Sequence, residues 1–323
     1  MMYDYQSKFG CRIKAFIAQK NALGYPYRES CRILRDFDSF CMSKFPLEFK
    51  LTQELCTAWA MKKPTEGNNT FRNRLMPIRE FAYFLIQNGE AAYVIPSNLA
   101  KHLHAQVPYI FSTAEILSLW NYFDNIPERK NYPVRHLVIP MLFRLLYCCG
   151  LRPAEVRKLC VNDVVLERGR LNIAESKGHR SRVVMMADDV SEMMRNYNQA
   201  VSATMPHRTV FFPDSNGNVY TKEWIEKTFR IARKAVGLSS GTGGNFPRPY
   251  DFRHSFATHR LYRWMKEGKD LKAMLPYLSA YMGHTELSHT YYYIHLVPGM
   301  FEEMSGFDFS KTEALLPEVS WDD

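Results

Sequence analysis

Helix-breaking residues divide the first 104 residues into four segments, and these breaks constrain the fold more than any other feature of the chain. The breaks fall at Gly24-Tyr25-Pro26, at Phe45-Pro46 and at Pro64-Thr65-Glu66-Gly67. Proline lacks an amide hydrogen and glycine tolerates turn conformations, so both tend to end helices. Between the breaks apolar residues recur at helical spacing, as Ile33 and Phe37 do. The pattern predicts a small domain built as a bundle of four helices.

Arginines line a second face of two of these segments. They are Arg28, Arg32 and Arg35 in the second segment and Arg72, Arg74 and Arg79 in the fourth. A run of charge on a helix ordinarily does no more than solvate it. Two basic faces in one small bundle instead favour a clamp around DNA, because each phosphate that an arginine neutralises adds affinity. We therefore expect these six arginines to contact DNA.

A second, larger domain is expected from residue 109 onward. It starts with a helix, since Ser112-Thr113-Ala114-Glu115 has the form of a capping box. A helix from about Val134 to Cys149 follows, and Gly150 can end it, because glycine adopts the left-handed conformation of many helix ends. Pro153 then suits the first turn of the next helix.

Three alternating stretches predict a small sheet in this second domain. They are Val164 to Leu166, Arg170 to Ile173 and Arg182 to Met186, joined at Arg168-Gly169 and at Lys177-Gly178-His179. Such short connections join antiparallel strands. The expected fold is mainly α with a small antiparallel β-sheet, in which a helical bundle precedes an α+β domain.

Positive charge is concentrated ahead of the last 23 residues. The 323-residue chain has 42 Lys and Arg against 33 Asp and Glu, a formal charge of +9. From Phe301 onward seven acidic residues accompany one lysine, so the rest of the chain carries +15. Such an excess favours a polyanionic partner. The acidic tail also carries Leu315, Leu316 and Trp321, which suit packing on protein better than on phosphate.

Seven cysteines are scattered without a CxxC pair or a metal-ligand spacing. We interpret them as reduced core residues of a cytoplasmic protein, because disulfides are rare in the cytosol. The first ten residues lack an apolar signal segment, and the most apolar stretch, His136 to Leu151, is interrupted by Arg144. That stretch is too short for a membrane span. Neither secretion nor membrane insertion is expected.

Two candidate site residues lie near the predicted sheet, and each also has an ordinary structural explanation. Arg152 precedes the helix opened by Pro153, where amide groups and the helix dipole favour an anion. It could equally pair with Glu155 on the next turn. Lys177 lies at the hairpin tip beside Arg180, and a basic tip is either solvated or able to enter a DNA groove.

Three more candidates follow in the last quarter of the chain. Apolar residues at helical spacing surround Arg253, so a buried ion pair would explain this arginine as well as a site would. A single histidine such as His284 is more often structural than catalytic. Tyr293 adjoins Tyr291 and Tyr292, and a tyrosine cluster on a helix ordinarily belongs to a core or an interface. The order and spacing of all these residues together indicate a phosphoryl-transfer site.

Five stretches resemble motifs of the tyrosine recombinase (phage integrase) family. Gly150-Leu151-Arg152-Pro153-Ala154-Glu155-Val156 is similar to its first arginine motif, and Ser176-Lys177-Gly178 with Arg182-Val183-Val184 to its lysine hairpin. Phe252-Arg253-His254-Ser255-Phe256-Ala257-Thr258 resembles the second arginine box, Met282-Gly283-His284 the late histidine motif and Tyr293-Ile294-His295 the nucleophile segment. The resemblance implies a helical core-binding (SAM-like) domain over residues 1–104 and a recombinase catalytic domain over residues 109–323.

One position departs from the family pattern. The second arginine box usually reads His-x-x-Arg, and Tyr250 stands here in place of the histidine. His254, next to the arginine, also matches a common family residue, though not the one usually assigned to catalysis. A tyrosine hydroxyl can donate a hydrogen bond to a phosphate oxygen, but it does not carry the positive charge of an imidazolium. We expect catalysis to survive this change at a lower rate.

The resemblance implies site-specific recombination by transesterification. Tyr293 would attack a DNA phosphodiester, forming a 3'-phosphotyrosyl bond and releasing a 5'-hydroxyl. Arg152, Arg253 and His284 would stabilise charge on the non-bridging oxygens. Lys177 would protonate the leaving oxygen. This chemistry requires no cofactor and no metal. The partners implied are double-stranded DNA recombination sites and a homotetramer on DNA, with the acidic tail exchanged between protomers.

Two alternatives stay open beside recombination. A DNA-binding accessory protein would keep the fold but no longer cut DNA, and Tyr250 would mark the first catalytic residue that it has lost. A type IB topoisomerase shares the chemistry but relaxes DNA without exchanging partners. A requirement for a defined recombination site would separate the recombinase from the topoisomerase.

Overall fold

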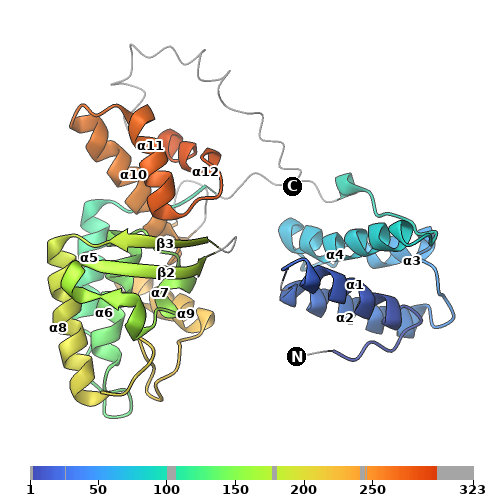
Figure 1. Cartoon of the computed structure of the whole chain (residues 1–323), viewed down its shortest axis with the longest axis horizontal. Helices are drawn as coiled ribbons and strands as arrows, with labels where there is room; N and C mark the ends of the chain where they lie inside the picture. Colours follow the sequence, from blue (N-terminus) through green and yellow to red (C-terminus); the bar gives the residue numbers. More distant parts are fainter. Residues whose placement is uncertain are drawn as a thin grey trace. The chain divides into compact units, whose positions relative to one another are not determined.

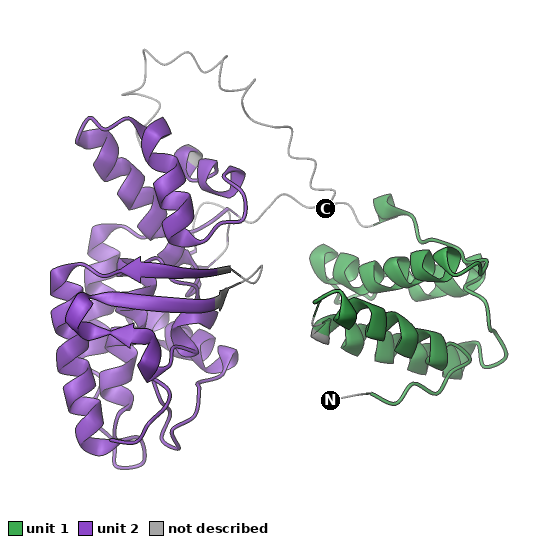
Figure 2. Ribbon diagram, viewed as in Figure 1, with its two compact units in different colours: residues 1–105 green, residues 106–323 purple. Residues whose placement is uncertain are grey.

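The computed structural model describes residues 3–25, 27–99, 107–176, 180–240, 244 and 246–296. The chain divides into two compact units, residues 1–105 and 106–323 (Figure 2). Most of the described residues are helical, and the sheet found among them is small (Figure 1).

Unit 1 contains the four helices that the sequence predicts. They are α1 (Gly10–Ala22), α2 (Arg28–Lys44), α3 (Gln53–Trp59) and α4 (Asn68–Gln87), followed by the short 3-10 helix η1 (Ser97–Leu99). Aromatic rings fill the core between them: Phe9 meets Phe81 edge-on with ring centroids 6.4 Å apart, and Phe37 meets Trp59 at 5.2 Å. Ring contacts of this kind add to the hydrophobic gain of burying each side chain.

Unit 2 contains the larger set of helices and the sheet. Its helices are α5 (Thr113–Asp124), α6 (Arg135–Cys148), α7 (Pro153–Arg157), α8 (Asp188–Thr204), α9 (Lys222–Ala235), α10 (Asp251–Lys266), α11 (Leu271–Met282) and α12 (Ser288–Tyr291), with 3-10 turns η2 (Val161–Asp163), η3 (Leu166–Arg168) and η4 (Ile294–Leu296). The predicted start and stop signals are confirmed: Ser112 and Glu115 form the capping box of α5, Gly150 has φ +58° just past α6, and Pro153 is the first residue of α7.

The sheet has three antiparallel strands in the order β1-β2-β3, as predicted. They are β1 (Val164–Val165), β2 (Arg170–Ser176) and β3 (Arg180–Met185). Val164 lies opposite Leu171, and Ile173 lies opposite Arg182. The long pair β2 and β3 extends further toward the hairpin than the alternating residues suggested, because the backbone ladder continues to Ser176 and Arg180 beyond a register irregularity.

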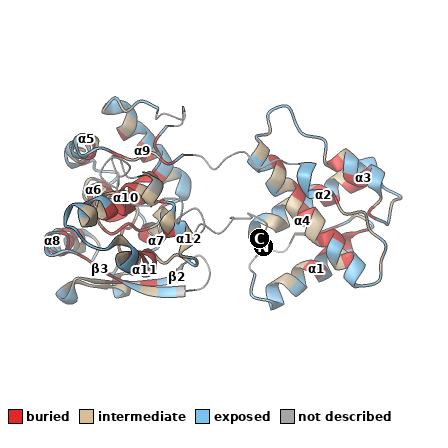
Figure 3. Ribbon diagram, turned by 90° about the horizontal axis from the view of Figure 1, so that it is seen from above, coloured by how far each residue is buried: buried red, intermediate tan, exposed pale blue. Residues whose placement is uncertain are grey.

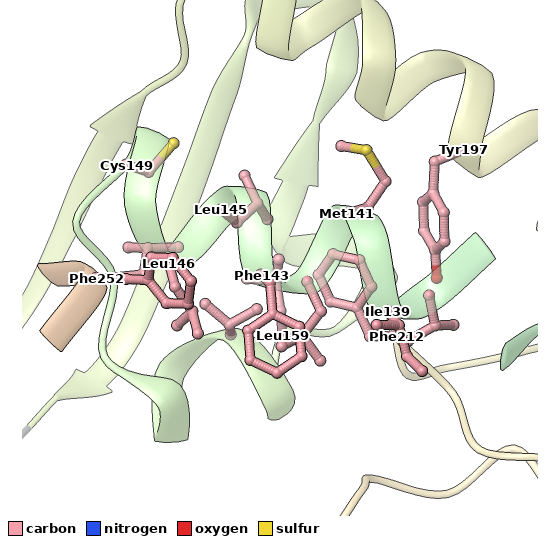
Figure 4. Packing of buried hydrophobic residues seen from close by; sticks show 14 of the residues in the cluster. Ile139, Met141, Phe143, Leu145, Leu146, Cys149, Leu159, Tyr197, Phe212 and Phe252 are labelled. Carbon is pink, nitrogen blue, oxygen red and sulfur yellow. The ribbon is translucent and has the colours of Figure 1, made fainter. Parts of the chain in front are cut away.

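Helix α6 is the centre of the unit 2 core. It packs against α5, α7, α8 and α10, and its side chains meet residues from several other segments (Figure 4). Phe143 stacks on Phe123 of α5 with ring centroids 4.6 Å apart, and it contacts Phe252 of α10 at 6.0 Å. This core holds α10 in the interior of unit 2, where much of the helix is buried (Figure 3).

The cysteines are only partly in the core. All seven thiols are unpaired, and Cys41, Cys56 and Cys149 are buried. Cys11 and Cys160 are exposed, so their interpretation as core residues was wrong. Scattered spacing in a sequence does not reveal whether a residue faces the core or the solvent. Within the described ranges, no helix has the length and apolar content that a membrane crossing needs.

Candidate active site

Two glycines bring distant segments together at the candidate site. Gly150 follows α6 with φ +58°, and Gly283 follows α11 with φ +67°. A side chain would fit at neither position: a Cβ would lie 2.4 Å from Cδ1 of Phe256 at Gly150, and 2.9 Å from Cδ of Arg182 at Gly283. These close approaches let the carbonyl groups at both helix ends meet the arginines of the site.

Arg253 is the most deeply buried member of the site. Its side chain is fully inaccessible and comes from α10, where Nη1 donates to the carbonyl oxygen of Gly150 (2.6 Å) and Nη2 to that of Met282 (2.7 Å). Burial lowers the pKa of Arg253, although a guanidinium starts far above neutrality and stays charged. Its Nε is buried without a hydrogen-bond partner among the described residues. The hydrogen bonds go to carbonyl groups, so the buried ion pair considered from the sequence is not what holds this arginine.

Arg152 stands at the start of α7, as predicted. Its Nη1 donates to Glu155 (2.7 Å), which is the pairing that the sequence left open as an alternative. Its Nη2 donates to the carbonyl oxygen of Gly283 (2.9 Å), 131 residues further along the chain. The ion pair therefore fixes Arg152 against the end of α11, beside the carbonyl group that Arg253 binds.

Glu155 organises two arginines rather than one. Both of its carboxylate oxygens accept hydrogen bonds from Arg182 on β3, at 2.8 and 2.9 Å, and Arg182 also donates to the carbonyl oxygen of Tyr281. Burial by itself raises the pKa of Glu155, but the hydrogen bonds and charges of Arg182 and then Arg152 outweigh it and hold the pKa at about 2. The carboxylate is thus ionised at neutral pH and links the sheet to the site.

His284 follows the turn that ends α11. Its amide donates to the carbonyl oxygen of Ser279, and its Nδ1 lies 2.7 Å from the hydroxyl oxygen of the fully buried Thr290. Burial, followed by the charges of Arg253 and Arg152, lowers the pKa of His284 to about 3. The imidazole is therefore neutral in the free protein. If the Thr290 hydroxyl donates to Nδ1, the imidazole proton resides on Nε2, from which it can be donated to a ligand.

Tyr293 is buried in the same cluster, with 3% of its surface exposed. The prediction placed it in a tyrosine cluster on a helix, but only Tyr291 belongs to α12, and Tyr293 lies in the turn before η4. Its ring is nearly parallel to that of His284, at a centroid distance of 6.0 Å. Burial raises the pKa of the Tyr293 hydroxyl to about 12, against the opposing charge of Arg253. The hydroxyl is therefore protonated at neutral pH.

His254 is a site residue that the sequence motifs did not assign to catalysis. Its Nδ1 lies 3.1 Å from the hydroxyl oxygen of Tyr293. Burial, followed by the charges of Arg248 and Arg253, lowers the pKa of His254 to about 3. Tyr250, which replaces the usual histidine, is 37% exposed, and its ring stands edge-on to that of His254 at 5.0 Å. The position next to Arg253 was the available signal, and its contact with Tyr293 follows only from the packing of α10 against the last turns.

A basic hollow of about 400 Å³ opens beside this cluster. Its charged residues are Arg152, Arg157, Lys222 and Arg248 with one acid, Glu226, and Tyr250 also lines it. Four cationic side chains around one opening make it suited to an anionic ligand such as a phosphodiester. In the described ranges, no three His, Cys, Asp or Glu residues are grouped as metal ligands.

The hairpin candidates lie mostly outside the described structure. Lys177 is outside the described residues, while β2 and β3 end on either side of it at Ser176 and Arg180. The backbone of Arg180 begins β3, and its side chain is not among those described. The side chain of Arg28, at the start of α2, is likewise not among those described.

The other unit 1 arginines differ in exposure. Arg32 and Arg35 are exposed on α2 and form surface ion pairs with Asp36, at 3.5 and 3.1 Å. Arg72 and Arg79 on α4 are half-buried. Arg74 instead stabilises the fold of unit 1. It donates hydrogen bonds to both carboxylate oxygens of Glu66 at 2.8 Å, and its side chain is 11% exposed. It also donates to the carbonyl oxygens of residues 59 and 61.

Comparison with known proteins gives the fold and the site a family context. Residues 111–299 match the model of the phage integrase family. An integrase/recombinase of Sinorhizobium fredii is 30% identical over 305 residues, which span 92% of this chain and 96% of that protein. The tyrosine recombinase XerD of Rickettsia conorii is 25% identical over 82% of this chain and 86% of its own length.

Solved structures share the fold at low sequence identity. XerH site-specific recombinase bound to palindromic difH substrate has a TM-score of 0.63 with 18% identity, covering 91% of this chain and 83% of that one. The Tn1549 transposon integrase in complex with transposon right end DNA has a TM-score of 0.62 with 15% identity, covering 95% and 99%. The family match over more than half of the chain, the full-length relative and the shared fold lead to one conclusion: this chain belongs to the phage integrase family of tyrosine recombinases.

Proposed function

We propose that this protein cuts and rejoins DNA strands at specific sites through a covalent bond between Tyr293 and a 3'-phosphate. The observation that carries the proposal is the position of the Tyr293 hydroxyl, which lies 3.1 Å from His254 in a cluster that contains Arg253, Arg152 and His284. Attack by the phenol oxygen on phosphorus forms the phosphotyrosyl bond as the bond to the 5'-oxygen breaks. The reverse reaction, by the 5'-hydroxyl of a second strand, rejoins DNA.

Three side chains stabilise the phosphorane-like transition state in this proposal. Arg152 and Arg253 supply charged donors held by main-chain carbonyl groups, so little reorganisation is needed when charge develops. His284 supplies a neutral N–H donor, with Thr290 on its other nitrogen. The basic hollow bounded by Arg152 and Tyr250 receives the phosphodiester. Lys177 protonates the leaving 5'-oxygen, a role proposed from the lysine hairpin motif alone.

The wider DNA contacts are proposed on charge and, for two of the arginines, on exposure. Arg32 and Arg35 of α2 are exposed, and together with Arg28, Arg72, Arg79 and Arg180 they are the DNA-contacting arginines that we propose. Arg74 is left out, because the packing of unit 1 accounts for its guanidinium. We further propose a core-binding domain over residues 1–104, a catalytic domain over residues 109–323 and a homotetramer on two DNA sites. The acidic tail that would be exchanged between protomers lies outside the described residues.

The test is the covalent intermediate itself. Duplex DNA selected by the full-length protein from a random-sequence pool is incubated with wild type and with Tyr293→Phe, and denatured in SDS. We expect an SDS-resistant protein–DNA adduct with wild type and none with the variant, while both bind the duplex. Binding without any adduct in wild type, even on duplexes nicked to trap the intermediate, would refute cleavage and favour the non-catalytic accessory protein.

A further inference from the structure

The proposed cleavage leaves one proton without an acceptor. The Tyr293 hydroxyl is protonated in the free protein, because burial raises its pKa to about 12. As its oxygen bonds to phosphorus, the proton must move to another group. In the family pattern this region holds a histidine, whose imidazole nitrogen can accept a proton, but this chain has the phenol of Tyr250 there.

Two histidines lie close enough to Tyr293 to be compared. His284 stacks beside the phenol ring, and its Nδ1 is paired with Thr290 at 2.7 Å. His254 is the one that bonds to the reacting atom: its Nδ1 is 3.1 Å from the Tyr293 hydroxyl oxygen, within the range from which a proton is transferred. Tyr293 is buried and His254 is partly buried, so little water can reach this hydrogen bond.

We propose that His254 is the proton acceptor for Tyr293 during cleavage and the proton donor during rejoining. This inference rests on the proposed function. In the forward step Tyr293 loses its proton to Nδ1 of His254 as the oxygen–phosphorus bond forms. The bond from phosphorus to the 5'-oxygen breaks at the same time, and that oxygen takes a proton from Lys177. The reverse step returns both protons, so the protein is unchanged after a full cycle.

The charges around His254 fit this role once DNA is present. The groups that face its ring are Tyr293, Tyr250, Arg253 and Arg248. In the free protein burial, followed by the charges of the two arginines, keeps the imidazole neutral, so that it can accept a proton. A bound phosphodiester places a negative charge beside those arginines, and an opposite charge favours the imidazolium that proton transfer creates. Binding of the substrate therefore strengthens the base at the step that needs it.

The test separates a proton acceptor from a packing residue. The duplex is the one selected by wild type from a random pool, and the measured quantity is the single-turnover rate constant of adduct formation between pH 6 and 8. His254→Gln keeps a polar side chain of similar reach but does not take up a proton. We expect this variant to bind DNA like wild type and to form adduct about 100-fold more slowly or worse.

The pH profile distinguishes a proton acceptor from a packing residue. With His254 present, the rate constant stays flat over this window. Without it only the tyrosinate form reacts, and its population rises about tenfold per pH unit below the pKa of the phenol. A second substrate carries sulfur in place of the 5'-oxygen at the mapped cleavage position, which makes the leaving group independent of a general acid. His254→Gln should stay slow on this substrate, because the proton that it fails to accept comes from Tyr293.

A matched control exists on the same helix. His259 Nδ1 lies 2.9 Å from the hydroxyl oxygen of Tyr147, which repeats the histidine–tyrosine pair away from the reacting group. His259→Gln should retain the wild-type rate and the flat profile. An equal loss in His259→Gln, a flat profile in His254→Gln, or full rescue of His254→Gln by sulfur would each overturn the inference while leaving the proposed function intact. No adduct with wild type would instead overturn both.

Discussion

Replacing Glu155 with glutamine should destabilise unit 2 by about 3 kcal/mol at pH 7. The carboxylate joins Arg152 before α7 to Arg182 on β3, and its side chain is 6% exposed, so solvent screens these contacts little. Its pKa falls from an ordinary 4.5 to about 2, and that difference corresponds to about 3 kcal/mol of folding free energy.

The dependence on pH identifies the cause. Because the pKa of Glu155 is lower in the folded state, its contribution is complete above about pH 4.5 and is lost as pH falls toward 2. The difference in the free energy of unfolding between wild type and Glu155→Gln should therefore fall by about 2 kcal/mol from pH 7 to pH 3. A loss of this size is large against the total stability of an ordinary domain.

The assay is urea denaturation followed by tryptophan fluorescence in a Trp59→Phe background. The four remaining tryptophans all lie beyond residue 106, so the signal reports unit 2. Glu267→Gln is the control, since Glu267 also forms an ion pair, with Lys269 at 2.7 Å, but on the exposed surface. Its loss should leave the transition unchanged. A pH-independent gap, or a Glu155→Gln transition that matches the control, would refute the electrostatic account.

Three further predictions test the site and the fold. Gly283→Ala and Gly268→Ala place a side chain at the same φ of +67°, but only the added methyl group at residue 283 meets another side chain. Gly283→Ala should therefore lower the free energy of unfolding, measured in urea, by about 1–3 kcal/mol more than Gly268→Ala. Equal losses would contradict the close packing. Arg74→Ala should destabilise unit 1 by about 3 kcal/mol, whereas Arg35→Ala should leave its melting curve intact and lower the salt dependence of DNA binding by about one charge; a reversed pattern would reassign both arginines. Thr290→Val should slow adduct formation about tenfold without affecting DNA binding, and an unchanged rate would show that its hydroxyl does not orient the histidine.

Local patterns in the sequence determined the secondary structure and the family. Helix periodicity and its breaks predicted the four helices of unit 1, and the capping box, Gly150 and Pro153 predicted where helices of unit 2 begin and end. These signals operate within a few residues, so no knowledge of the packing was needed. The motif stretches likewise identified the phage integrase family from short segments, and the family match agrees with them.

Tertiary packing decided which of the polar residues work together. The hydrogen bond from Arg253 to Gly150 spans 103 residues, that from Arg152 to Gly283 spans 131, and the contact of His254 with Tyr293 spans 39. Periodicity carries no information about such partners, because they depend on how α10, α11 and the last turns fold onto one another. For the same reason the sequence left Arg74 among the DNA-binding candidates, and only its buried contacts with Glu66 assign it to the fold. The sequence by itself thus specifies the helices, the strands and the residue types of the site, whereas the three-dimensional structure specifies which atoms meet.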